Sequence, residues 1–88
     1  MIKHIDITII GEITNIGFRF QSMMAAYDQN VKGLVKYLEN GIAYIEAEGT
    51  SLQLETFIQQ FKNAPGAKIK DIKTVQGNIK NYQDFEII

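Results

Sequence analysis

The sequence predicts an α+β fold in which two helices cover one face of an antiparallel sheet. Two segments have apolar residues three and four apart, as in amphipathic helices, and each lies between segments that alternate apolar and polar residues, as in half-buried strands. An Asn-Gly pair joins the two middle strands as a hairpin. The resulting order is βαββαβ, to which a short C-terminal run can add a further strand. Two crossovers around one hairpin give the ferredoxin-like α/β sandwich.

The first third of the chain predicts a strand and then a helix. From Lys3 to Ile10, isoleucines alternate with polar residues at every second position. A helix is expected from about Phe18 to Gln29, and Asn30 suits the left-handed position just past its end. We expect the large side chains of this helix in the core, namely Phe18, Phe20, Met23, Met24 and Tyr27.

A hairpin and a second helix are expected next. The runs 33–38 and 42–48 flank Asn40-Gly41, which is a strong signal for a type I′ turn. Thr50 and Gln53 have the spacing of a capping box at a helix start. The buried stripe of that helix is expected to be Leu54, Phe57, Ile58 and Phe61.

The chain is then expected to end in strands. The segment 63–66, Asn-Ala-Pro-Gly, terminates the second helix. A fourth strand is expected from Lys68 to Val75, and 85–88 reads as a short closing strand. Lysines in and beyond the fourth strand are interpreted as edge residues that discourage aggregation.

Composition limits the classes of function. The 88 residues make one domain, 1–88, and the net charge of −1 gives no basic excess for nucleic-acid binding. The absence of cysteine excludes disulfides and thiolate catalysis. No apolar run approaches ~18 residues and no signal peptide is visible. We therefore expect a cytoplasmic monomer with no membrane or nucleic-acid partner, although Tyr37 and Tyr44 could offer stacking surfaces to RNA.

The most informative segment is Gly11 to Arg19, which lies between the first strand and the first helix. A glycine-containing turn before a helix brings backbone N–H groups, the positive end of the helix dipole and one guanidinium close together. That combination suits a phosphate or another small oxyanion. The sequence therefore predicts an anion site here.

Two motifs in the chain resemble signatures of the acylphosphatase family. The first signature reads roughly G-x-V-Q-G-V-G-F-R, and the matching residues are Gly11, Gly17, Phe18 and Arg19. The second reads roughly G-W-V-x-N-x-x-D-G-x-V-E-x-x-x-E-G, and its matches are Gly33, Val35, Gly41, Glu48 and Gly49. The resemblance spans nearly the whole chain.

The resemblance implies hydrolysis of the carboxyl–phosphate bond of small acyl phosphates, without metal or cofactor. It implies that Arg19 grips the phosphoryl oxygens and is catalytic. Tyr37 stands where the family has an asparagine that orients the attacking water, which implies a catalytic position with an altered residue. The phosphate-binding loop would comprise Ile13, Thr14, Asn15, Ile16, Gly17, Phe18 and Arg19.

Two functions follow as alternatives. One is an acylphosphatase-type hydrolase, intact or impaired by the tyrosine. The other is a noncatalytic domain that binds phosphate or another oxyanion, or that regulates a partner. Outside the loop, His4 shows no evident carboxylate partner, and Glu46 and Glu48 are interpreted as a solvated strand face rather than as metal ligands.

Overall fold

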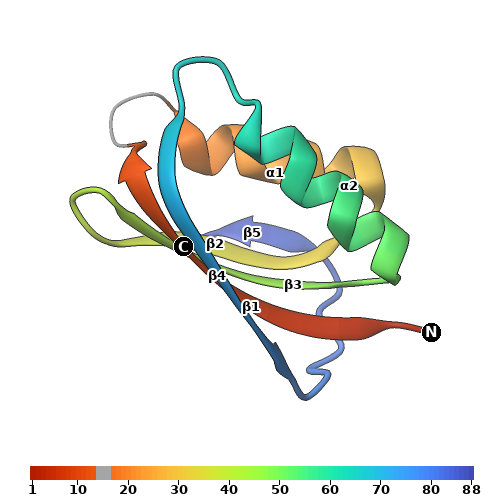
Figure 1. The fold of residues 1–88 in the computed structure, drawn as a ribbon. Coiled ribbons are helices and arrows are strands. Elements are labelled where there is room, and N and C mark those ends of the chain that lie inside the picture. Colours follow the sequence, from red (N-terminus) through yellow and green to blue (C-terminus); the bar gives the residue numbers. More distant parts are fainter. Residues whose placement is uncertain (14–16) are drawn as a thin grey trace.

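Five strands form one sheet, and two helices lie together on one of its faces (Figure 1). The computed structural model describes residues 1–13 and 17–88. Both helices have 12 residues, and none in the described part of the chain is long and apolar enough to cross a membrane. The elements are β1 (Lys3–Glu12), α1 (Phe18–Gln29), β2 (Lys32–Glu39), β3 (Ile42–Gly49), α2 (Ser51–Lys62), β4 (Lys68–Gly77) and β5 (Phe85–Ile87).

The order of strands across the sheet is β4-β1-β3-β2-β5. The predicted antiparallel arrangement is confirmed for the four longer strands, but β5 pairs with β2 in parallel, so the sheet is mixed. Backbone bonds fix this parallel pair, because the Gly33 N–H donates to the Asp84 carbonyl at 2.9 Å and the Ile88 N–H to the Val35 carbonyl at 2.9 Å. As predicted for the lysine-rich fourth strand, β4 lies at an edge.

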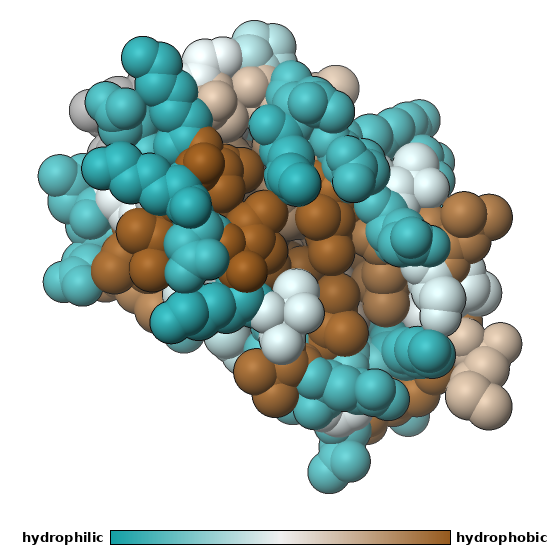
Figure 2. Space-filling model, in the orientation of Figure 1, coloured by the Kyte–Doolittle hydropathy of each residue, from teal (hydrophilic) through white to brown (hydrophobic). Residues whose placement is uncertain are grey.

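The core lies between the helices and the sheet. Ile7 and Ile9 of β1 and Ile45 of β3 face it and are fully buried, which confirms the alternation expected for these strands. Four phenylalanines run through this layer as edge-to-face pairs, with ring centroids 5.8 Å apart for Phe18–Phe61, 5.1 Å for Phe61–Phe57 and 5.8 Å for Phe57–Phe85. Figure 2 shows apolar side chains across the middle of one face of the molecule, with polar side chains around them.

The buried face of α1 differs from the predicted one. Phe20, Met24 and Tyr27 are about half exposed, at 54%, 55% and 54%, so their expected place in the core is wrong. Phe18 is buried as expected, and Met23 packs, partly buried, against the core. The buried stripe of α1 is formed by four residues: Phe18, Ser22, Ala25 and Ala26. Three of these four side chains are small, and small side chains let a helix lie close to its neighbours. The prediction assigned the large side chains of α1 to the core. Which side chains are buried depends instead on their positions around the helix axis.

Most of the predicted helix ends and turns are confirmed. Asn30 takes the left-handed conformation after α1, with φ 57° and ψ 36°. The Thr50 hydroxyl accepts the Gln53 N–H at 3.2 Å and the Gln53 side chain accepts the Thr50 N–H at 2.8 Å, which is the expected capping box. The type I′ turn is wrong, because only Gly41 of the Asn-Gly pair has positive φ and the register shifts between Tyr37 and Glu39.

The phase of α1 gives a test of the core. We expect Phe18→Ala to lower the free energy of unfolding by about 3–5 kcal/mol, because it empties a fully buried aromatic site on α1. Phe20→Ala is the matched control, and its effect should stay below about 1 kcal/mol because the ring is half exposed and alanine has the higher helix propensity. Urea unfolding measures both. Equal losses would contradict the observed helix phase.

Candidate functional site

The start of α1 is set by Gly17. Its φ of 70° and ψ of 29° lie in the left-handed region, where a side chain is strained, and its carbonyl accepts the Gln21 N–H at 2.9 Å. The next residue, Phe18, is fully buried against Phe61. Burial of Phe18 on one side of the turn leaves Gly17 and Arg19 exposed on the other. The first turn of α1 is thus anchored in the core by Phe18 and exposed to solvent at Gly17 and Arg19.

The two helices have different N-termini. The N-terminus of α2 is closed by the Thr50–Gln53 capping box, whereas no side chain among the described residues caps α1 and its first turn holds no acidic residue. The first N–H groups of a helix lack partners inside the helix, and they carry the positive end of its dipole. Arg19 adds a full positive charge in that same turn. This end of α1 therefore favours a bound anion.

Tyr37 of β2 contacts both sides of this turn. Its hydroxyl donates to the Ile13 carbonyl at 2.9 Å, just after the end of β1. The guanidinium carbon of Arg19 lies over the Tyr37 ring, 4.7 Å from the ring centroid. A second bond ties the same end of β1 to the hairpin, since the Gly11 N–H donates to the Gly41 carbonyl at 3.0 Å. The β2–β3 hairpin thus holds the segment that leads into the predicted loop.

Several predicted site residues therefore lie together. Tyr37 contacts both Ile13 and Arg19, and the turn beside them is formed by Gly17 and Phe18. The side chains of Ile13 and Phe18 are fully buried, so these two residues face the site only through the backbone. The remaining predicted loop residues lie outside the described part of the chain: Thr14, Asn15 and Ile16.

A groove lies elsewhere, between α1 and α2, and has a volume of about 580 Å³. Met24, Tyr27 and Pro65 are among its lining residues, and the Gln60 amide donates to the Asp28 carboxylate beside it at 2.7 Å. None of the described residues of the predicted anion site lines this groove. It offers no cluster of groups that would define a ligand.

A second polar cluster lies on the sheet face opposite the helices. His4 on β1 stands across from Glu48 on β3, and Asp6 across from Glu46. His4, Glu46 and Glu48 are 1%, 8% and 4% exposed, so the expected solvated face is wrong, as is the expectation that His4 lacks a carboxylate partner. Alternation along each strand already placed these side chains on one face. Their burial depends on the segment after β4, which sequence reasoning did not place over them.

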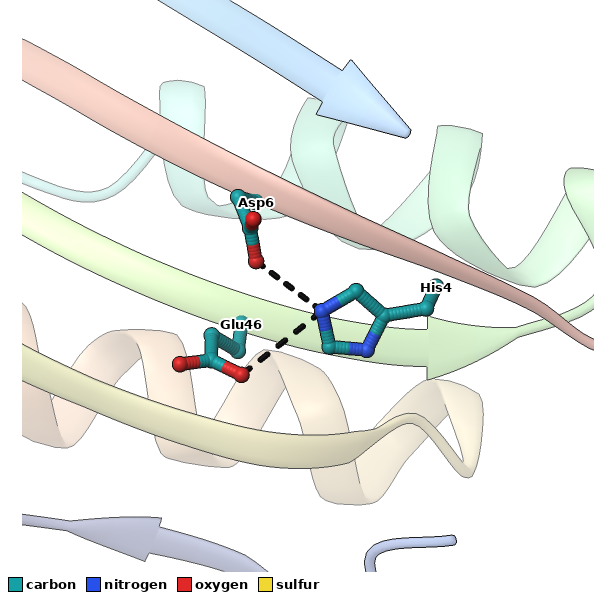
Figure 3. A group of neighbouring side chains, drawn as sticks. All are labelled: His4, Asp6 and Glu46. Carbon is teal, nitrogen blue, oxygen red and sulfur yellow. Dashed lines mark hydrogen bonds and ion pairs between the residues drawn. The ribbon is translucent and has the colours of Figure 1, made fainter. Parts of the chain in front are cut away.

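Both ring nitrogens of His4 face carboxylates. Nδ1 lies 2.7 Å from Glu48, and Nε2 lies 2.9 Å from Asp6 and 3.6 Å from Glu46; Figure 3 shows the latter two contacts. A neutral imidazole donates only one hydrogen bond, so the form of the ring that donates to both carboxylates is the doubly protonated one. Burial disfavours that charge, but the bonds to Glu48 and Asp6 outweigh it and raise the pKa of His4 above 6.5.

The two glutamates hold the segment that covers them. Glu48 accepts the backbone N–H groups of Lys80 and Tyr82 at 2.6 and 3.1 Å. Glu46 accepts the Lys80 ammonium at 2.7 Å and the Tyr82 hydroxyl at 2.6 Å. Burial acts to raise the pKa of each glutamate, but these bonds outweigh it and lower both below 4.5. The cluster thereby fixes the connection between β4 and β5.

The same groups have the chemistry of metal ligands. One nitrogen of His4 and one oxygen each of Asp6 and Glu46 lie within 4.8 Å of one another. Nitrogen and carboxylate ligands of this kind suit zinc and related ions. Here, however, a proton on His4 and the Lys80 ammonium already neutralise these oxygens. In this state the cluster is an ion-pair network, and a metal would have to displace both cations.

Comparison with known proteins points to one family. The family model described as acylphosphatase matches residues 5–87. An acylphosphatase of Ligilactobacillus salivarius is 34% identical over 97% of both chains. The crystal structure of acylphosphatase from Bacillus subtilis superposes with a TM-score of 0.92 at 29% identity, covering 100% of this chain and 99% of that one. Full-length HypF in its phosphate- and nucleotide-bound form gives a TM-score of 0.91 at 32% identity, over 12% of its length.

The protonated state of His4 gives a test of the polar cluster. Because its folded pKa is raised, His4 contributes stability that is full below 6.5 and is lost as pH rises through the folded pKa. Glu46 and Glu48, with lowered pKa values, contribute stability that is full above 4.5 and is lost as pH falls. We therefore expect the free energy of unfolding to be greatest between about pH 4.5 and 6.5, as measured by urea unfolding across pH.

His4 is the sole histidine, so its ring protons give a direct NMR titration. The loss of stability above pH 6.5 should have the same midpoint as the NMR titration of His4. The substitution His4→Asn should abolish that part of the pH dependence. A measured pKa at or below 6.5 would contradict the assignment of two donated bonds.

Proposed function

The chain belongs to the acylphosphatase family, and we propose that it hydrolyses the carboxyl–phosphate bond of small acyl phosphates at the N-terminus of α1. The main support for this proposal is Arg19, which lies in the first turn of that helix, where no acidic residue is present and no side chain among residues 1–13 and 17–88 forms a cap. Both features attract a phosphoryl group. Small acyl phosphates and inorganic phosphate are the ligands that fit such a site.

The proposed reaction needs positioning and positive charge rather than a covalent intermediate. The oxygen of a water molecule attacks phosphorus, the bond from phosphorus to the acyl oxygen breaks, and the carboxylate leaves with the bonding electrons. The proton released by the water ends on the phosphate product. Arg19 and the first N–H groups of α1 stabilise the charge on the phosphoryl oxygens throughout. The proposal assigns no metal or cofactor to this step.

The proposed site has no residue well suited to orient the attacking water. By family resemblance Tyr37 occupies the position of the residue that orients the water. A phenol has one hydrogen to donate, and that of Tyr37 goes to the Ile13 carbonyl. The oxygen can only accept a bond from water, and the ring is longer than an asparagine side chain. A misplacement of about 1 Å costs on the order of 10²-fold in rate. We therefore propose slow turnover.

The same hydrogen bond favours a second candidate function. If no group orients water, the site binds phosphate or another oxyanion without hydrolysing an acyl phosphate, as a noncatalytic or regulatory domain. The two candidates share the anion site and differ only in turnover. Phosphate binding without any acyl phosphate hydrolysis at high protein concentration would select the second.

We propose that the protein acts without a nucleic-acid partner. A net charge of −1 and a pI of about 5.7 support the absence of a nucleic-acid partner. We also propose a cytoplasmic monomer that meets small phosphorylated molecules.

The role of Arg19 is tested by removing its charge. We expect Arg19→Ala to lower kcat/KM for a small acyl phosphate by about 10²–10³-fold, since the guanidinium acts on the charge of the phosphoryl group. Phosphate release from a small acyl phosphate is the measurement. Lys62→Ala is the matched control, because it also removes one positive charge, but from the last turn of α2. An equal effect of both substitutions, or none of either, would contradict the assignment of Arg19.

The role of Tyr37 in limiting turnover is tested by Tyr37→Asn. An amide donates and accepts hydrogen bonds and can hold a water, so we expect kcat for acyl phosphate hydrolysis to rise by about 10-fold or more. KM should rise as well, because Arg19 loses the ring beneath it. An unchanged kcat would show that orientation of water by residue 37 does not limit the reaction.

A further inference from the structure

We propose that Tyr37 is a positioning residue for the anion site, whose ring holds the Arg19 guanidinium and whose hydroxyl holds the Ile13 carbonyl. This inference rests on the proposed function, since it assumes that Arg19 contacts the anion. It assigns Tyr37 a role that differs from orienting water. In this role the side chain acts on the two ends of the predicted loop and does not touch the reacting atoms.

The ring contact restricts Arg19. An exposed arginine has many rotamers, and binding an anion requires it to give up most of them. The Tyr37 ring offers one preferred place for the guanidinium carbon, 4.7 Å from the centroid, and the attraction between a cation and an aromatic face favours it. A guanidinium that lies over a ring still has N–H groups free to bind two oxygens of one phosphoryl group. The contact therefore orients Arg19 before the anion arrives.

The hydroxyl contact restricts the entry to the loop. Tyr37 donates to the carbonyl of Ile13, the last described residue before Arg19's turn, and the side chain of Ile13 is fully buried. The bond between Gly11 and Gly41 fixes the backbone two residues earlier. Tyr37 is itself held, because it pairs with Ala43 in the sheet and packs against the core. A rigid strand thus holds Ile13 on one side of the predicted loop and Arg19 on the other.

The two contacts can be separated experimentally. Tyr37→Phe keeps the ring and removes the hydroxyl, whereas Tyr37→Leu removes both. Tyr44→Leu is the matched control, because Tyr44 is also a strand tyrosine with a cation over its ring, Lys36 at 5.7 Å, but lies on the opposite sheet face. Arg19 is the sole arginine, so its side-chain N–H gives one assignable NMR signal that reports on the ring.

The experiment is a titration of each ¹⁵N-labelled protein with inorganic phosphate, together with urea unfolding. We expect Tyr37→Leu to move the Arg19 side-chain signal and to weaken phosphate binding about 3- to 30-fold. Tyr37→Phe should keep the Arg19 signal near its original place, bind phosphate more tightly than Tyr37→Leu, and shift the amides next to Ile13. Tyr44→Leu should bind phosphate as the natural protein does.

The outcomes separate this inference from the proposed function. If Arg19→Ala abolishes phosphate binding but Tyr37→Leu binds within twofold of the natural protein, the positioning role is wrong and the anion site stands. If Arg19→Ala binds phosphate as well as the natural protein does, the site itself is misplaced and both proposals fail. If Tyr37→Leu does not fold, Tyr37→Phe decides, because a displaced Arg19 signal in that folded variant would contradict a role for the ring.

Discussion

The chain of four phenylalanines between the sheet and the helices is the constraint on which the rest of the structure depends. Phe18 begins it at the first turn of α1, and Phe85 ends it on β5. Burying these rings fixes α1 and α2 over the sheet and draws β5 alongside β2. Because Phe18 points inward, the left-handed Gly17 and the charged Arg19 are left at the surface. The proposed site is therefore a consequence of how the core closes.

Tyr37 connects that core to the chemistry. It links β2 to Ile13, just after β1, and to Arg19 in the first turn of α1. A site built on a strand is held more precisely than a site built on a loop alone. In the proposed function the same contact limits catalysis, since the donated hydrogen of the tyrosine goes to the Ile13 carbonyl and is not free for a water molecule. The proposed anion binding and the proposed slow hydrolysis thus have one physical cause.

Much of the fold could be predicted because local signals agreed with the packing. Alternating isoleucines gave β1, the Thr50–Gln53 capping box gave the start of α2, and Asn30 gave the end of α1. The buried face of α1 could not be predicted from side-chain size, because Ser22 and two alanines face the core while Phe20 does not. The parallel pairing of β5 also depends on tertiary contacts that leave no local pattern.

The start of α1 and the His4 cluster also differ in how well they could be predicted from the sequence. Gly17 and Arg19 could be placed beside a helix start because they lie two residues apart in the sequence. The partners of His4 could not, because Glu48 lies 44 residues away and the covering residues Lys80 and Tyr82 belong to an irregular segment. Long-range burial, rather than residue type, decides that His4 is part of an ion-pair network. That network holds the connection to β5, which in turn lies beside the strand that carries Tyr37.

Inhibition of acyl phosphate hydrolysis by inorganic phosphate tests whether both ligands bind at the start of α1. One site at the start of α1 that binds both predicts competitive inhibition, with an inhibition constant equal to the Kd for phosphate measured by direct titration. Noncompetitive inhibition, or an inhibition constant far from that Kd, would show that hydrolysis and phosphate binding take place at different sites and would contradict the account.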